Sequence, residues 1–387
     1  MPDINPKILI WARETAGLAP AEAAQKLGIK ASRLESFETG GEKPSRAALV
    51  KMAKRYRRPL VAFYLPEIPR EGDHGRDFRT LPESVSRTDK GLADVVVRNI
   101  HARQTVVRAS LEVIGEAKPL PFIGSMNRKN GVAAVVSSIE KTLGFNRKTF
   151  RDSRGSGESF AYLRALVENC GVFVLLIDNL GSWHTTVSAE VFRGFALADD
   201  VAPFVAVNAN DSPSAWSFTL MHELAHLWIG ASGVSGSRAE QGIEKFCNDV
   251  ASEFLLPAKE VKALSVTGET PLAEAMARIG EFARARKVSG AMVAYKLHRA
   301  GAYDFERFQE IAAAYRKDFQ DRKEREKKRK SDGDGGPNYY VVRKHRVGAT
   351  LVRFVDRMMN EGYLSATKAG RVLGVGAHNV HRLIGRA

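Results

Sequence analysis

The spacing of apolar residues predicts helices along most of the chain. Ile8, Leu9 and Ala12 recur at helical spacing near the start, and Gly17 ends that segment. Further helices are expected at residues 20–27, 31–38, 45–56, 90–116, 131–143 and 158–169. Residues 1–68 are therefore predicted to form a compact all-helical unit.

A second pattern appears before residue 211. Runs rich in β-branched and aromatic residues lie at 171–177, 185–197 and 203–210. They predict a small three-stranded sheet packed on helices, which is an α+β arrangement. We therefore expect a multidomain, mainly α protein with an α+β core.

Polar and glycine-rich stretches predict where the chain divides. "REGDHGRDFRTLPES" follows residue 69, and "SDGDGGPN" has the composition of a flexible hinge. The predicted parts are an all-α domain (1–68), a linker with a bridging helix (69–120), the α+β domain (121–315), a basic helix end with a hinge (316–337) and a C-terminal helical domain (338–387).

Two short helices separated by a glycine predict a helix-turn-helix in the first domain. Ala23 lets the helices approach closely, and Gly28 permits the turn. Lys30, Ser32 and Arg33 stand at the start of the second helix, where a recognition helix meets base edges and phosphates. Binding to double-stranded operator DNA is the favoured interpretation. The alternative is a bundle used only for packing or dimerisation.

Composition and charge narrow the class of protein. Of the 387 residues, 44% are hydrophobic and 27% are charged. No run reaches the ~18–20 apolar residues that cross a membrane, and the N-terminus lacks a signal-peptide pattern. The two cysteines suit a reducing compartment, so a cytoplasmic protein is expected. The net charge of +15 permits a polyanionic partner, although the basic run at 322–330 is more typical of a solvated helix end.

The segment "FTLMHELAHLWIG" at 218–230 predicts a metal site. Residues four apart lie on one face of a helix, so His222 and His226 can direct ring nitrogens at one ion, typically Zn²⁺. Glu223 projects beside that point, where it can take a proton from water activated by the metal. The pattern alone also occurs by chance on ordinary helices.

A catalytic zinc ion usually has a third protein ligand. The metzincin continuation is excluded, because Ile229 and Ser232 occupy its glycine and histidine places. The next helix offers Glu244, with Asn248 one turn later to hydrogen-bond a ligand. Competing carboxylates are those of Glu240, Asp249 and Glu253. For an oxyanion donor, His184, Asn208 and Asn210 stay open.

At these motifs the chain resembles the ImmA/IrrE-type zinc metallopeptidases. "FVAVN", "FTLMHELAHLW" and "EKFCNDVASEFLLP" carry the resemblance over residues 193–257, and the first 68 residues resemble an Xre/Cro-type helix-turn-helix. The resemblance implies a zincin-like metallopeptidase domain with zinc on His222, His226 and Glu244, and with Glu223 as the catalytic base. It also implies a regulator protein as the substrate. Cys247 stands where alanine is common in the family.

The sequence therefore predicts a DNA-binding, zinc-dependent metalloendopeptidase that hydrolyses a repressor or antitoxin encoded nearby. The alternative is a transcriptional regulator or antitoxin whose metal site is structural or sensory. If the first domain, residues 1–68, binds a palindromic operator, a homodimer is expected.

The C-terminal segment, residues 338–387, repeats part of the sequence pattern of the first domain. A shift of 346 residues places Gly28 on Gly374 and Leu27 on Leu373. This echo predicts a second helix-turn-helix-like unit, with a set of polar side chains on or near its second helix: Arg371, His378, Asn379, His381 and Arg382. A helical hairpin that packs on the peptidase or mediates dimerisation is the equal alternative.

Overall fold

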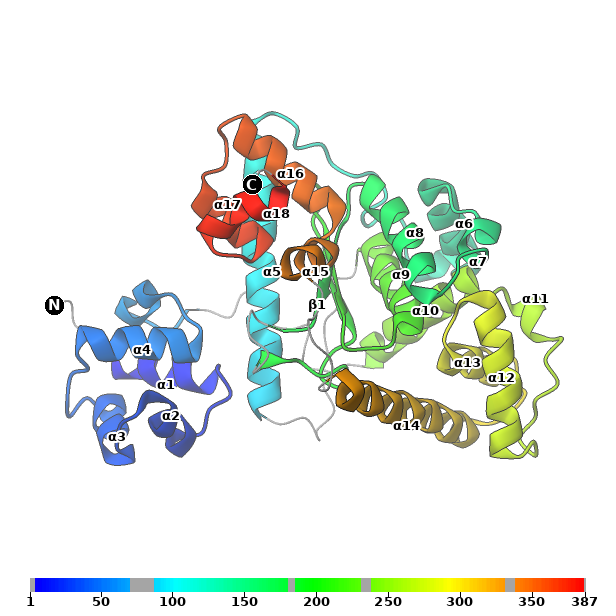
Figure 1. Ribbon diagram of the computed structural model, residues 1–387, viewed down its shortest axis with the longest axis horizontal. Coiled ribbons are helices and arrows are strands. Elements are labelled where there is room, and N and C mark those ends of the chain that lie inside the picture. The colour runs from blue at the N-terminus through cyan, green and yellow to red at the C-terminus, as the bar shows by residue number, and fades with distance from the viewer. Residues whose placement is uncertain (1–3, 70–86, 180–184, 231–237, 331–337, 386–387) are drawn as a thin grey trace. The chain divides into compact units, whose positions relative to one another are not determined.

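The computed structural model describes residues 4–69, 87–179, 185–230, 238–330 and 338–385 (Figure 1). The chain is mainly helical and divides into two compact units. One unit holds residues 1–102 and 179–192, and the other holds residues 103–178 and 193–387. The multidomain, mainly α fold class is as predicted.

The first domain is a bundle of short helices. Its elements are α1 (Pro6–Glu14), α2 (Pro20–Leu27), α3 (Ala31–Thr39), α4 (Arg46–Tyr56) and the 3-10 helix η1 (Leu60–Tyr64). Asn5 and Ser45 cap α1 and α4 by accepting hydrogen bonds from main-chain N–H groups. The side chains of Leu9, Leu34 and Tyr56 lie in the bundle core. The predicted helices of this domain are therefore confirmed.

Gly28 makes the turn between α2 and α3. It lies in the left-handed region, with φ 68° and ψ 39°, where a residue without a Cβ is favoured. The buried Arg13 guanidinium pairs with Glu38, near the end of α3, at 2.7 Å. This pair joins α1 to α3 across the bundle.

A long helix follows, α5 (Arg87–Val113), and the division at residue 102 falls within it. In the second unit, Gln104 of this helix is buried and donates to the carbonyl oxygens of Leu197 and Ala202, each at 3.0 Å. The C-terminal part of α5 is thereby tied to the segment around the second strand. The bridging helix predicted at 90–116 is present with slightly different ends.

A three-stranded sheet lies in the second unit in the order β1-β3-β2. β1 (Phe173–Ile177) runs parallel to β3 (Phe204–Asn208), and β2 (Gly194–Leu197) runs antiparallel to β3. The sheet is as predicted, but the run at 185–197 is a strand only in its last four residues. A turn at 189–191 interrupts it, and Thr186 forms an isolated β-bridge with Asn179 outside the sheet.

Helices pack around this sheet and around one central helix, α9 (Pro213–Ile229). α9 contacts β2, β3 and the helices α8 (Ser156–Asn169) and α10 (Arg238–Leu255). The remaining helices of this region are η3 (Arg128–Asn130), α6 (Val132–Leu143), α7 (Arg147–Arg151), α11 (Ala258–Val261), α12 (Leu272–Arg286), α13 (Gly290–Arg299) and α14 (Phe305–Lys330). The basic run at 322–330 is the C-terminal end of α14, and its described side chains, at 322–325, are exposed.

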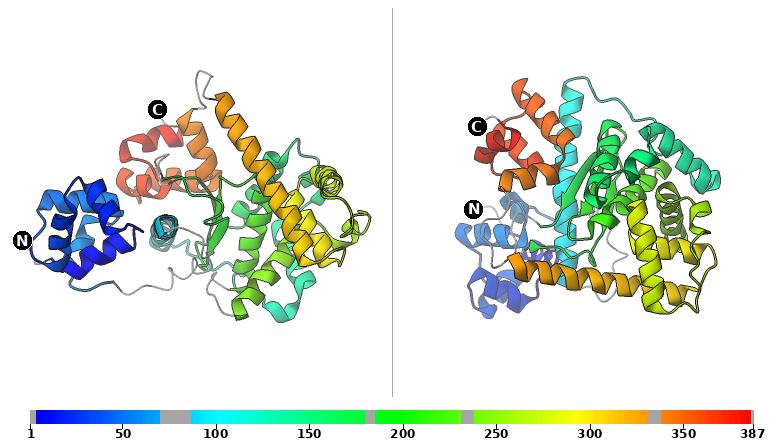
Figure 2. Two further views of the ribbon diagram at one scale, coloured as in Figure 1. Left: turned by 90° about the horizontal axis from the view of Figure 1, so that it is seen from below. Right: turned by 45° about the vertical axis from the view of Figure 1, so that its right-hand side comes forward.

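The C-terminal segment forms a compact group of short helices, coloured orange to red in Figure 2. These are α15 (Tyr339–Val347), α16 (Ala349–Asn360), α17 (Ala366–Leu373), the 3-10 turn η5 (Ala377–Asn379) and α18 (Val380–Ile384). Phe354 packs edge-on against Phe173 of β1, with ring centroids 6.0 Å apart. The main-chain N–H of Thr350 donates to Glu168 of α8 at 3.3 Å. The segment therefore packs on β1 and α8.

No helix among the described residues is both long and apolar enough to cross a membrane.

Candidate metal centre

Helix α9 is apolar on nearly every side, which is typical of a helix that is buried all round. Leu220, Leu224 and Trp228 are fully buried, and the Trp228 ring stacks on Phe122 with centroids 4.3 Å apart. Gly230 ends the helix in the left-handed region. This packing fixes the rotation of α9 about its axis and therefore the direction in which its polar residues point.

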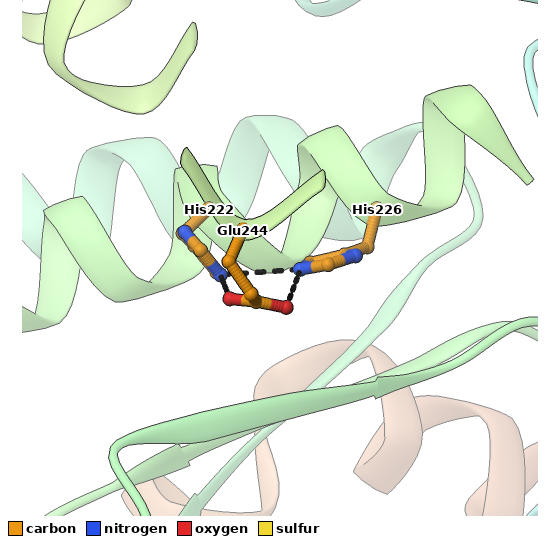
Figure 3. Close-up of side chains that lie close together, drawn as sticks. All are labelled: His222, His226 and Glu244. Carbon is orange, nitrogen blue, oxygen red and sulfur yellow. Dashed lines mark hydrogen bonds and ion pairs between the residues drawn. The ribbon is translucent and has the colours of Figure 1, made fainter. Parts of the chain in front are cut away.

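His222 and His226 lie one turn apart on α9 and point toward α10 (Figure 3). Their Nε2 atoms are 3.1 Å apart. The Glu244 carboxylate of α10 spans both rings, with Oε2 3.1 Å from Nε2 of His222 and Oε1 3.2 Å from Nε2 of His226. Among the described residues, this trio is the one group of His, Cys, Asp and Glu that could together hold a metal ion.

The spacing of these atoms fits one small metal ion. Two ligand atoms that each lie ~2.0–2.1 Å from a tetrahedral zinc ion are roughly 3.3 Å apart. The separations of 3.1 and 3.2 Å between the nitrogen and oxygen atoms are close to that value. Two imidazoles and one carboxylate also form a ligand set found at catalytic zinc sites that keep one position open.

The electrostatics of the trio favour a charged carboxylate. Burial raises the pKa of Glu244, but hydrogen bonds to the two imidazoles outweigh that effect and hold its pKa far below the usual range. Burial also works to lower the pKa of His226, yet the Cys247 thiol and the Glu244 carboxylate beside it leave that pKa well above normal. Glu244 is thus kept in the anionic form that a metal ion requires.

Glu223 lies on the sheet side of α9, against β2. Its side chain is only 7% exposed and accepts a hydrogen bond from the N–H of Ala196. Gly194 makes room for it, because a Cβ there would lie 3.1 Å from Glu223 Oε1 and 2.4 Å from Thr219 Cγ2. Burial raises the pKa of Glu223, while the two nearby imidazoles oppose the shift.

Two of the other candidate acids of α10, Asp249 and Glu253, are engaged elsewhere. Asp249 accepts hydrogen bonds from Tyr295 at 2.7 Å and from Arg299 at 2.6 Å. Glu253 pairs with Lys296. The side chain of Glu240, the remaining competitor, lies outside the described residues. Of the described acids considered for the third ligand, Glu244 is the one that the structure brings to the histidines.

The hydrogen bonds expected to support the metal ligands are not seen among the described residues. Asn248 is half-buried on α10, but among the described residues no hydrogen bond joins its amide to Glu244 or to either histidine. Nδ1 of each histidine likewise has no hydrogen-bond partner of good geometry among the described residues. The role assigned to Asn248 stays a prediction.

The possible oxyanion donors mainly stabilise the end of the sheet. The Asn208 side chain accepts a hydrogen bond from the N–H of Asn210 at 2.9 Å, and Asn210 Nδ2 donates to the carbonyl of Asp178 at 2.8 Å. His184 lies outside the described residues.

Cys247 is the residue near the trio whose position the sequence did not predict. It is fully buried on α10, and its thiol lies close enough to His226 to raise the pKa of that ring. Cys247 precedes Asn248 and follows Glu244 by three positions, which puts it on nearly the same face of α10 as the carboxylate. That spacing is the signal from which its position could have been found.

The proposed DNA contacts lie on the surface of the first domain. Lys30, Ser32 and Arg33 are all exposed at the start of α3. Arg33 is not isolated, because it pairs with Glu42 at 2.7 Å and lies 5.5 Å from the centre of the Phe37 ring. In the absence of DNA, the Arg33 guanidinium group is therefore paired with the Glu42 carboxylate.

Comparison with known proteins gives the class of each domain. Residues 9–62 match the family model of a helix-turn-helix domain. Residues 179–298 match that of the IrrE N-terminal-like domain, a peptidase family. None of the curated proteins and none of the solved structures compared with the chain matches it.

The chain therefore joins an N-terminal helix-turn-helix domain, of the kind that binds DNA, to an IrrE-type peptidase domain. The resemblance stated from the sequence motifs is confirmed, and the family indicates a metallopeptidase. His222, Glu223, His226 and Glu244 all fall inside the matched peptidase segment.

Proposed function

We propose that this protein is a DNA-binding, zinc-dependent metalloendopeptidase that cleaves a regulatory protein. The observation that carries the proposal is the convergence of His222, His226 and Glu244, next to a buried glutamate on the same helix. The match of the surrounding segment to a peptidase family supports it.

His222, His226 and Glu244 would hold the zinc ion. When bound, zinc supplies a Lewis acid that activates water near neutral pH. The protein supplies the orientation: the fully buried side of α9 fixes the two imidazoles, and α10 brings the carboxylate across from a second helix.

Glu223 is the proposed general base. It takes the proton of the attacking water and later delivers it to the leaving amine of the cleaved peptide. Burial raises the pKa of its carboxyl group above the ordinary value. The Ala196 N–H holds the carboxylate by a hydrogen bond, and the absence of a side chain at Gly194 leaves room for it.

An extended peptide is the proposed form of the substrate. The N–H of Asn208 donates to the carbonyl of Arg193, so the main-chain groups of Gly194 and Ala196, the next non-bonded positions of β2, point away from β3. The Ala196 N–H is used by Glu223, which leaves the main-chain groups of Gly194 and the carbonyl of Ala196 for a peptide. Main-chain groups at the edge of a sheet can pair with an added strand. Glu223 lies at this same edge, next to Ala196.

The helix-turn-helix domain would bring the peptidase to double-stranded operator DNA, with Lys30, Ser32 and Arg33 as contacts. A repressor or antitoxin encoded nearby is the proposed protein substrate, and a homodimer would match a two-fold operator. A cytoplasmic location is part of the same proposal.

The test compares two variants against candidate substrates. Proteins encoded by the neighbouring genes are purified, and each is incubated with the zinc-loaded protein. Glu223→Gln should retain zinc and lose cleavage by a factor of roughly 10² or more, because it removes the base but no ligand. His222→Ala should lose both zinc and cleavage. Equal cleavage by Glu223→Gln and the parent would reject the hydrolase and leave a structural or sensory metal site.

A further inference from the structure

The C-terminal helices repeat the turn geometry of the first domain. α2 and α17 each contain eight residues, and they start at residues 20 and 366, which differ by 346. Gly28, after α2, has φ 68° and ψ 39°, and Gly374, after α17, has φ 66° and ψ 39°. The sequence echo therefore corresponds to the same left-handed turn.

The segments after the two turns also correspond. α3 begins at Ala31, and the helical stretch made of η5 and α18 begins at Ala377, again 346 residues later. Both stretches end at a left-handed glycine, Gly40 with φ 84° and Gly385 with φ 87°. The C-terminal helix is less regular, because it opens with a 3-10 turn.

The inner face of this C-terminal hairpin is apolar and closely packed. Its fully buried residues are Ala369, Val372, Leu373, Val380 and Leu383. Gly370 lets the turn and the start of η5 approach α17, since a Cβ there would lie 2.7 Å from the carbonyl oxygen of Val375. The inner face is thus used for folding, as in a helix-turn-helix.

Helix α15 anchors the hairpin from behind. Arg343 Nη2 donates to the carbonyl oxygens of Leu373 at 2.8 Å and Gly374 at 2.9 Å. The Tyr340 hydroxyl donates to Asn379 Oδ1 at 2.8 Å. Asn379, which the sequence grouped with the outward polar residues, is therefore used in packing.

The outer face is basic and carries no acid. Its exposed basic residues and histidines are Lys368, Arg371, His378, His381 and Arg382. No Asp or Glu occurs from residue 362 to residue 387. In the part of the chain that the structure describes, Lys368, Arg371 and Arg382 form no ion pair, whereas Arg33 of the head is paired with Glu42.

Such a surface suits a polyanion better than a protein. Tyr363 is the only large apolar residue of the described segment 362–385 that is strongly exposed. Clustered guanidinium and ammonium groups without counter-charges bind phosphates by releasing condensed cations. A short helix presented beyond a left-handed turn is also the element that enters the major groove of duplex DNA.

We propose that residues 363–385 form a second helix-turn-helix that binds double-stranded DNA through Arg371, Arg382 and their neighbours. This site is separate from the DNA contacts of residues 30–33 and does not depend on the peptidase activity.

Binding of the full-length protein to a mixed-sequence duplex tests the proposal. Arg371→Ala/Arg382→Ala is compared with Lys259→Ala/Lys262→Ala, which removes two exposed positive charges near α11. Affinity is measured between about 50 and 200 mM salt. The first variant should bind about 10-fold more weakly or worse, and the slope of log affinity against log salt should fall by about 0.9 for each lost phosphate contact. The control should bind like the parent.

A third variant, Lys30→Ala/Arg33→Ala, distinguishes DNA binding by the first domain from DNA binding by residues 363–385. If it abolishes binding while the Arg371/Arg382 variant leaves both affinity and salt slope unchanged, the C-terminal proposal is wrong and DNA binding by the N-terminal domain stands. A full-length protein that prefers single-stranded RNA, or that binds no duplex at low salt, would also overturn it. Unchanged thermal unfolding of the exposed-site variants shows that the fold is intact.

Discussion

At the scale of single residues, the function proposed here depends on how closely side chains approach around α9. The sequence predicted His222, Glu223 and His226 because the spacing of a helix fixes their faces. It left four acids open as the third ligand, because spacing along α10 does not fix the rotation of that helix. The partners of Asp249 and Glu253 come from α13, about 40 or more residues later, which no local pattern reports.

Gly194 provides a residue-scale prediction. In Gly194→Ala, the new Cβ would meet Thr219 Cγ2 at 2.4 Å and Glu223 Oε1 at 3.1 Å. We expect a loss of about 1–3 kcal/mol in the free energy of unfolding, and lower cleavage with zinc still bound. Urea denaturation and metal analysis measure the two effects.

Gly157→Ala is the matched control, because no atom lies within 4 Å of a Cβ built there on α8. This change should be neutral or slightly stabilising. Equal stability of the Gly194 and Gly157 variants would show that β2 does not approach α9 as closely as described.

At the scale of elements, the apolar spacing predicted the helices and the three strands, but it misjudged where the second strand begins. Residues 185–193 have the composition of a strand, yet a turn at 189–191 interrupts them. Composition alone cannot predict whether a partner strand is available for pairing. The two helix-turn-helix turns were predictable, because glycine is the residue that the left-handed position favours.

The two turn glycines give an element-scale prediction. In Gly28→Ala, no atom lies within 4 Å of the new Cβ, so only backbone strain of about 1 kcal/mol is expected. In Gly374→Ala, the Cβ would also lie 2.0 Å from Arg343 Nη2 and would displace the guanidinium from the end of α17. The second variant should therefore lose more stability.

Chemical denaturation of both variants measures the difference. If Gly374→Ala costs no more than Gly28→Ala, then Arg343 does not anchor the C-terminal hairpin.

At the scale of the whole molecule, the positive charge is distributed over surfaces with different chemistry. The net charge of +15 was visible in the sequence, but the sequence did not predict which cations have partners. The pair between Arg33 and Glu42 joins residues nine positions apart across the end of α3, outside helical spacing. The C-terminal basic face has no such acid in its sequence.

The ion pair between Arg33 and Glu42 leads to a prediction for the whole protein. Glu42→Gln should tighten binding to duplex DNA at low salt, because it frees Arg33 and removes a negative charge that repels phosphate. Arg33→Ala should weaken binding. Fluorescence anisotropy over a range of salt concentrations measures both changes. Weaker binding by Glu42→Gln would place the DNA away from the start of α3.

The central claim is that one zinc ion is held by two imidazoles and a carboxylate. X-ray absorption at the zinc edge of the purified full-length protein tests it most directly. We predict about one zinc ion per chain with only nitrogen and oxygen neighbours at ~2.0–2.2 Å. Zinc that is lost in Glu244→Gln but retained in Lys245→Gln would identify the carboxylate. A sulfur neighbour at ~2.3 Å, which would bring Cys247 into the ligand set, or a folded protein with no transition metal, would contradict the account.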